Sequence, residues 1–211
     1  MATYESIVKI KGAVGDLVFY DLNGKNVVRK KSGFNKAAFK KAPSYEKVRQ
    51  NSSEFGHCSK TGKIIRTNLN SYIKEAGDPL LYQKFAKLMT EIKDLDPVSG
   101  RGSRTVDKGL QTKEGKALLN RFQFGEKKKL PDGIQILDHI LYVDEKVSAD
   151  TITLVTICID FENYKTECFE ENISLSDNGK VNFKKQFSEN DSLLYFVVLR
   201  KNKEITHMGF A

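Results

Sequence analysis

The sequence predicts an α+β protein with an N-terminal β-hairpin plus helices and a C-terminal small antiparallel β-sandwich or barrel. Residues 17–30 contain two β-type runs on either side of Asn23-Gly24, the pair favoured in two-residue type I′ turns. Residues 44–122 show mostly helical periodicity, and after about residue 131 the pattern changes to short β-type runs. We therefore predict a basic hairpin-plus-helical region over 1–130 and an acidic β-sandwich-like domain over 131–211.

The hairpin is the strongest local signal. With Asn23-Gly24 as its loop, Leu22 faces Lys25, Tyr20 faces Val27 and Phe19 faces Val28. Because an isolated hairpin is marginal in water, we expect the alternating residues 4–10 to add a strand beside it, or the hairpin to dock elsewhere. Residues 32–45 are interpreted as a basic, irregular connector.

Three helices follow. Pro43 or Ser44 begins a helix that runs to Ala76, where Gly-Asp-Pro ends it, and a second helix starts near Pro79. A short helix is predicted over 112–122. Between the last two lies a loop, 96–109, rich in Gly, Ser and Arg. Its composition resembles an anion-binding nest, but we favour a flexible linker.

The C-terminal part contains six β-type runs separated by turn residues. They are residues 134–143, 151–161, 165–175, 180–187, 192–201 and 204–210. Several short strands at near-regular spacing are typical of an antiparallel sandwich or barrel.

One apolar stripe runs along the long helix. At 100° per residue it contains Val48, Ser52, Phe55, Cys58, Gly62, Ile65, Leu69, Tyr72 and Ala76. Its small central residues predict that another element packs closely there. Arg66 lies inside the stripe, so we expect it to pair with a carboxylate or to reach the surface. Glu54, at the edge of the stripe, is an expected internal partner of an arginine.

The charge is unevenly distributed. Residues 1–130 hold 27 Lys and Arg against 13 Asp and Glu, whereas residues 131–211 hold 8 against 14. A row on one flank of the long helix, from Arg49 through Gly56 to Lys74, contains no acidic residue. Such a row can follow a phosphate backbone or an acidic protein surface, or it is simply a solvated helix face. The predicted polyanion-binding residues are Arg29, Lys30, Lys31, Lys40, Lys41, Arg49, Lys60, Lys63 and Lys74.

The sequence contains few residues suited to catalysis. His57, His139 and His207 lack metal-ligand spacing, and no C-x-x-C pair occurs among the three cysteines. His57 and Cys58 diverge by about 100° on a helix, so they cannot act as base and nucleophile. We expect no enzyme, cofactor or metal. Because neither a signal peptide nor a membrane-spanning run is apparent, we expect a cytoplasmic protein without membrane contact.

Several segments together resemble an uncharacterised family common in Bacteroidetes. They are "LVFYDLNGKNVVRKKSGF" (17–34), "APSYEKV" (42–48), "RQNSSEFGHCSKTGKIIR" (49–66), "SGRGSRTVDKG" (99–109) and "LLNRFQF" (118–124). They are similar to its Arg-Glu-Asn-x-x-Glu-Phe-Gly core, its Gly-Lys-Leu-Leu-Arg run and two later motifs. Gln50 replaces the glutamate of that core. The family has no established activity. The resemblance implies one structural unit containing Arg49, Asn51, Glu54, Phe55, Gly56, Gly62, Lys63 and Arg66.

Two functions are consistent with these features. The first is a non-catalytic binding protein whose basic N-terminal half contacts a polyanion, most plausibly nucleic acid. The alternative is a structural subunit of a homo-oligomer or larger assembly, in which basic and acidic halves of neighbouring copies dock. A viral or mobile-element assembly is one form of this alternative.

Overall fold

The computed structural model describes residues 2–6, 8–31, 33, 36–127, 129–131, 133–144, 147, 149–173, 179–188 and 191–211. The chain forms two compact units, residues 1–49 and 50–211. The fold is α+β, with N-terminal strands, then helices, then antiparallel sheets.

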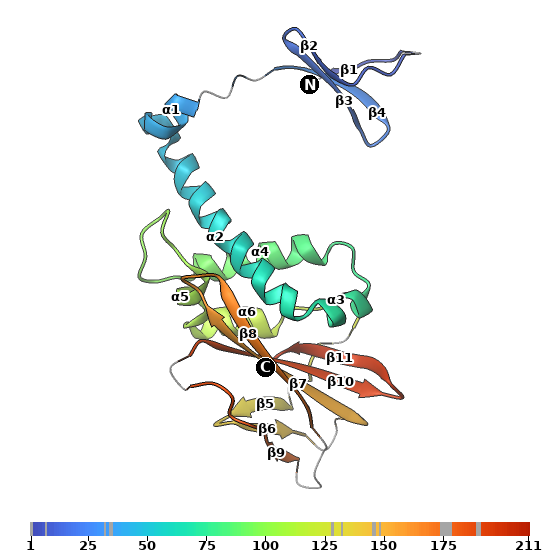
Figure 1. Cartoon of the computed structure of the whole chain (residues 1–211), viewed down its shortest axis with the longest axis vertical. Coiled ribbons are helices and arrows are strands. Elements are labelled where there is room, and N and C mark those ends of the chain that lie inside the picture. The colour runs from blue at the N-terminus through green and yellow to red at the C-terminus, as the bar shows by residue number, and fades with distance from the viewer. Residues whose placement is uncertain are drawn as a thin grey trace. The chain divides into compact units, whose positions relative to one another are not determined.

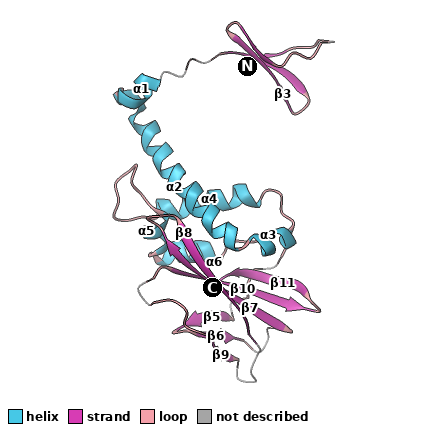
Figure 2. Ribbon diagram, in the orientation of Figure 1, coloured by secondary structure: helices cyan, strands magenta, loops and turns pink. Residues whose placement is uncertain are grey.

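The first unit contains a small antiparallel sheet of order β1-β4-β3-β2. Its strands are β1 (Ala2–Thr3), β2 (Gly12–Val14), β3 (Leu17–Leu22) and β4 (Lys25–Lys30). Asn23 and Gly24 both have positive φ (53° and 80°), as a type I′ turn requires. The predicted register is confirmed, since Leu22 faces Lys25 and Tyr20 faces Val27. Figure 2 shows this hairpin as paired strands.

The strand predicted over residues 4–10 is wrong. The strand beside β4 lies earlier, at Ala2–Thr3, and the described residues of 4–10 are not in a strand. Tyr4 explains the difference: its ring packs edge-on against Phe19 at 5.6 Å, and its hydroxyl donates to the carbonyl of Ile10. These two contacts hold the segment in a loop.

The basic connector contains a helix that the sequence did not indicate, α1 (Lys36–Lys41), followed by a 3₁₀ turn, η1 (Pro43–Tyr45). Arg49 donates through Nη1 to the carbonyls of Phe39 (2.7 Å) and Ala42 (3.1 Å). Carbonyls at the end of a helix lack intrahelical partners, so this arginine stabilises the short helix.

The helices of the second unit follow the prediction with two changes. They are α2 (Glu46–Asn68, beginning in the first unit), α3 (Asn70–Ala76), α4 (Leu81–Asp94), α5 (Val106–Leu110) and α6 (Lys113–Asn120). The predicted helix over 44–76 is interrupted at Leu69, where Asn68 donates its side-chain amide to the carbonyl of Ile64. Helix α5 lies where a loop was expected and is capped by Thr105, whose side chain accepts from the N–H of Lys108.

Two antiparallel sheets complete the second unit. One has the order β11-β10-β7-β8, and the other β5-β6-β9. Their strands are β5 (Ile134–Leu137), β6 (Ile140–Val143), β7 (Thr151–Asp160), β8 (Lys165–Ile173), β9 (Lys180–Asn182), β10 (Leu193–Lys201) and β11 (Glu204–Phe210). The run 134–143, expected as one strand, is a hairpin. Asp138 and His139 form its turn, both with positive φ.

The second unit has three layers, with the helices on one face of the β11-β10-β7-β8 sheet and β5-β6-β9 on the other (Figure 1). Alternation along β7 places Val155 and Ile157 in the core shared with the helices, and Ile152 and Leu154 in the core shared with the smaller sheet. The predicted boundary at residue 130 therefore does not separate two cores, because helices and sheet bury one set of side chains together.

The apolar stripe of the long helix is covered only in its C-terminal part. Gly62 faces α4 so closely that a Cβ there would lie 3.1 Å from Cγ of Met89. Cys58 donates from Sγ to the carbonyl of the same Met89. Val48 and Phe55, expected in the buried stripe, are instead 50% and 60% exposed. Close packing by α4 therefore begins near Cys58.

This packing predicts opposite effects at two glycines of one helix. Gly62→Leu places a branched side chain against Met89 and Phe85 and should lower the free energy of unfolding by about 1–3 kcal/mol. Gly56→Leu is the control, because a Cβ at Gly56 meets nothing within 4 Å. It should stabilise the helix by up to about 1 kcal/mol. Urea unfolding measures both, and equal effects would contradict the packing.

Candidate functional site

The predicted cations of the first unit are largely exposed. Arg29 and Lys30 end β4, Lys31 follows, and Lys40 and Lys41 form the last turn of α1. This unit holds 11 Lys and Arg against four Asp and Glu, a net charge of +7 out of +8 for the chain. The second unit is nearly neutral as a whole, because the acidic residues 131–211 offset the basic residues 50–130.

Arg49 differs from the other predicted cations. It is half-buried, and one nitrogen of its guanidinium donates hydrogen bonds to the carbonyls of Phe39 and Ala42. Its position in the first unit separates it from the other helix residues that the family resemblance groups together, which belong to the second unit. A structural role at the end of α1 therefore accounts for Arg49.

The three remaining predicted cations, Lys60, Lys63 and Lys74, lie in the second unit and are exposed. Lys60 places its ammonium 4.9 Å from the centre of the Tyr164 ring. Lys63 lines a cleft between α2 and the start of α4. The nine predicted cations are thus divided between the two compact units.

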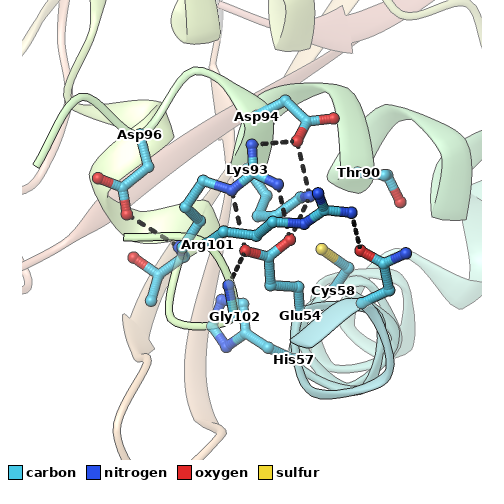
Figure 3. Close-up of polar contacts among 12 residues, drawn as sticks. Glu54, His57, Cys58, Thr90, Lys93, Asp94, Asp96, Arg101 and Gly102 are labelled. Atoms are coloured by element: carbon cyan, nitrogen blue, oxygen red, sulfur yellow. Dashed lines mark hydrogen bonds and ion pairs between the residues drawn. The ribbon is translucent and has the colours of Figure 1, made fainter. Parts of the chain in front are cut away.

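A buried carboxylate organises the middle of α2. Glu54 is only 3% exposed, and its two oxygens accept bonds from Nε and Nη2 of Arg104 at 2.9 and 2.8 Å. Lys93 of α4 donates to Oε2 at 2.8 Å, and the N–H of Gly102 donates to Oε1 at 2.6 Å (Figure 3). The expectation that Glu54 pairs with an arginine is confirmed.

A second carboxylate, that of Asp94, binds the same two cations. Asp94 accepts bonds from Lys93 at 2.7 Å and from Nη1 of Arg104 at 2.8 Å, so two cations share two carboxylates. The bond from Arg104, helped by Lys93 and Gly102, outweighs burial and holds the pKa of Glu54 well below its ordinary value. Burial alone would lower the pKa of Lys93, but its bonds to Asp94 and Glu54 raise it.

The loop at 96–105 is therefore an ordered clamp, and its interpretation as a flexible linker is wrong. Burial would raise the pKa of Asp96, but bonds from the N–H groups of Ser99, Thr105 and Val98 lower it to about 2. Gly102 has φ +95°, and a Cβ there would lie 2.8 Å from Cγ of Gln50, so glycine is required. The anion that this Gly- and Arg-rich loop binds is the chain's own Glu54.

Two further side chains of α2 join the clamp. Asn51 accepts a bond from Arg101 at 3.0 Å. His57 accepts a bond from the N–H of Val106 through Nε2, and its Nδ1 lies 2.9 Å from the hydroxyl of Tyr164. Burial lowers the pKa of His57, which favours the neutral imidazole needed to accept the Val106 bond.

The remaining motif residues face outward or an aromatic cluster. Phe55 is exposed, and Gly56 leaves open space around it. Arg66 does not form the expected carboxylate pair: no carboxylate of a described residue lies within 4 Å of it. Its guanidinium carbon instead lies 4.3 Å from the centre of the Tyr82 ring and 5.7 Å from that of Phe85.

A larger cavity of about 660 Å³ is located elsewhere, between α5, α6, β10 and the β5–β6 turn. Lys116 lines it together with two carboxylates, Asp107 and Asp191. This charge balance does not favour a polyanion. No group of three or more His, Cys, Asp or Glu side chains suited to a metal occurs in the described part of the chain.

Sequence reasoning missed the partners of the predicted residues. Arg104, Lys93 and Gly102 lie 39 to 50 positions after Glu54, and no local pattern connects them. The resemblance singled out the two segments that meet here, 49–66 and 99–109, without indicating their contact. Tyr82 and Tyr164 gave no sequence signal.

Comparison with family models, with curated proteins and with solved structures found no match. Within the described residues, no helix is long and apolar enough to span a membrane.

Removing the charge of Glu54 should destabilise the fold strongly. Glu54→Gln leaves Lys93 and Arg104 partly uncompensated near the core and should cost about 3–5 kcal/mol at pH 7, measured by urea unfolding. Because the folded pKa of Glu54 is depressed, its contribution is present above the unfolded pKa, about 4.3, and is lost as pH falls below it. Glu54→Gln should therefore show a flatter loss of stability in acid than the parent protein.

Glu75→Gln is the matched control. Glu75 also pairs with an arginine, Arg200, at 3.1 Å, but its side chain is 38% exposed. Exposed pairs contribute about 0–1 kcal/mol. Equal costs for the two variants would contradict the organising role of Glu54.

Proposed function

We propose that this protein is a non-catalytic binding protein whose basic N-terminal half contacts a polyanion, most plausibly nucleic acid. The observation that carries the proposal is the concentration of charge: the first unit has a net charge of +7, whereas the remaining 162 residues have a net charge of +1. Phosphate contacts by Lys and Arg supply most of the affinity in sequence-independent nucleic-acid binding.

The exposure and the lack of ion pairing of three cations in the first unit support the same proposal. Arg29, Lys30 and Lys31 are consecutive and exposed, and none of them forms an ion pair with a carboxylate of a described residue. The cations that are committed to internal carboxylates, such as Lys93 and Arg104, belong to the second unit. Lys93 and Arg104 therefore stabilise the fold, whereas Arg29, Lys30 and Lys31 are accessible to a partner.

Oligonucleotide binding across a salt titration tests this function. The full chain should bind a random single-stranded oligonucleotide at about 50 mM salt, with affinity falling steeply as salt rises. The triple variant Arg29→Gln, Lys30→Gln, Lys31→Gln should flatten the slope of log K against log salt by about 2, because each phosphate contact contributes about 0.7.

The control removes three exposed cations from the acidic half: Lys165→Gln, Lys184→Gln and Lys203→Gln. It lowers the net charge equally and should leave the slope nearly unchanged. If the parent protein does not bind at low salt, or if the two triple variants behave alike, the proposal is wrong.

A second candidate, a structural subunit of an assembly, is favoured by the poor core of the first unit. Val27 is the one buried side chain among the described residues of this unit. Large aliphatic side chains are exposed instead, and a small sheet needs an apolar cover to be stable. They are Val8 (66%), Ile10 (40%), Val14 (60%), Leu17 (42%) and Leu22 (49%). In such an assembly the acidic residues 131–211 of a neighbouring copy complement the charge of this unit.

Light scattering over a concentration series tests this candidate. The parent protein should self-associate, and Val14→Lys with Leu17→Lys should reduce association, because these residues face each other across β2 and β3. Val98→Lys with Leu137→Lys is the control, since both side chains are exposed in the second unit (74% and 57%). A strict monomer at every concentration would count against the assembly.

A further inference from the structure

An open cleft of about 400 Å³ lies between the end of α2, α3 and the start of α4. Its polar lining combines Lys63, Arg66, Thr67 and Asn70 with the aromatic Tyr82. The volume falls within the range of small-ligand sites, about 300–1,000 Å³. All of its lining residues belong to the second unit.

Arg66 is held in this cleft by an aromatic ring. Its guanidinium lies over Tyr82, 4.3 Å from the ring centre, and Nη1 makes a long bond of 3.4 Å to the carbonyl of the same residue. A guanidinium has five N–H donors, so most of its donors remain available. A stacked, pre-oriented arginine is well suited to phosphate.

The other charges of the cleft favour an anion. Lys63 lies one turn before Arg66 on α2, and it is exposed without an ion-pair partner among the described residues. Asp78 also lines the cleft, but both of its oxygens are engaged, one by Lys84 at 2.6 Å and one by the N–H of Leu80. Its charge is thus compensated, and the cations of Lys63 and Arg66 dominate.

Tyr82 adds a stacking surface. Its side chain is 59% exposed although Arg66 covers part of the ring, and Leu80 beside it is 51% exposed. Bases of single-stranded nucleic acids stack on such rings, whereas bases in a duplex are already stacked on each other. Thr67 is committed, since its hydroxyl donates to the carbonyl of Lys63.

We propose that this cleft is a subsite for single-stranded nucleic acid: Arg66 and Lys63 bind a backbone phosphate, and an unpaired base stacks on Tyr82. The inference rests on the proposed function and deepens it, because it assigns contacts to the second unit and selects single strands over duplexes.

The test compares three probes on the full chain: an oligothymidylate of about ten nucleotides, a duplex of the same length, and inorganic polyphosphate of similar charge. Tyr82→Ala should weaken oligothymidylate binding about five- to hundredfold. It should weaken polyphosphate binding much less, because polyphosphate has no base to stack and loses only the support that the ring gives to Arg66. Tyr82→Phe, which keeps the ring, should bind like the parent. Arg66→Gln should weaken the binding of oligothymidylate and of polyphosphate, and the parent should prefer oligothymidylate to the duplex.

The outcomes separate the two proposals. If the parent binds no oligonucleotide, both are overturned. If it binds, and only the Arg29, Lys30, Lys31 triple variant weakens binding, the proposed function stands and the subsite is wrong. Equal binding of Tyr82→Ala and Tyr82→Phe, or of single strand and duplex, overturns base stacking on Tyr82.

A urea-unfolding curve of each variant shows whether its fold is intact. If Arg66→Gln unfolds, Arg66→Lys takes its place. This variant keeps the charge, and weaker binding of oligothymidylate and of polyphosphate is expected because the planar, stacked guanidinium is lost.

Discussion

The buried carboxylate of Glu54 is the contact on which the arrangement of the second unit depends. Its bond with Lys93 connects α2 to α4, and its bond with Gly102 connects α2 to the 96–105 loop. Its bonds with Arg104 fix the residues that lead directly into α5. An ionised carboxylate at 3% exposure is tolerated only when its lone pairs are filled, and here four donors fill them. Because these donors come from segments far apart in sequence, their bonds to one residue fix how the segments meet.

This internal ion network clarifies the role of the basic residues. The Gly- and Arg-rich loop resembles an external anion site in composition, yet the N–H groups of Gly102 and Thr105 and the side chain of Arg104 are occupied by Glu54, Asp94 and Asp96. Net charge alone therefore overstates what this protein offers to a partner. The exposed cations without an internal acid include those of the first unit and Lys63 in the cleft between α2 and α4. A polyanion-binding function rests on that distinction.

The sequence predicted features that depend on neighbouring residues. Asn23-Gly24 gave the register of the hairpin, and alternation located the C-terminal strands. Prediction from the sequence failed where residues far along the chain determine the surroundings of a side chain. Phe55 fits the apolar stripe, but α4 packs closely only from about Cys58 onward, so the ring stays exposed. Arg66 was expected to pair with a carboxylate on electrostatic grounds, but its guanidinium stacks on Tyr82 of α4. The Asp138-His139 turn lacks the glycine that marks Asn23-Gly24.

Hydrogen–deuterium exchange of the full chain, with and without a single-stranded oligonucleotide at low salt, tests the central claim most directly. The account predicts that the oligonucleotide slows exchange in residues 25–31, 36–41 and 63–82. It also predicts no change in residues 96–105, whose donors Glu54 and Asp96 already occupy. Slower exchange in residues 96–105 without a change in the other segments would contradict the account, because the loop would then be the anion site.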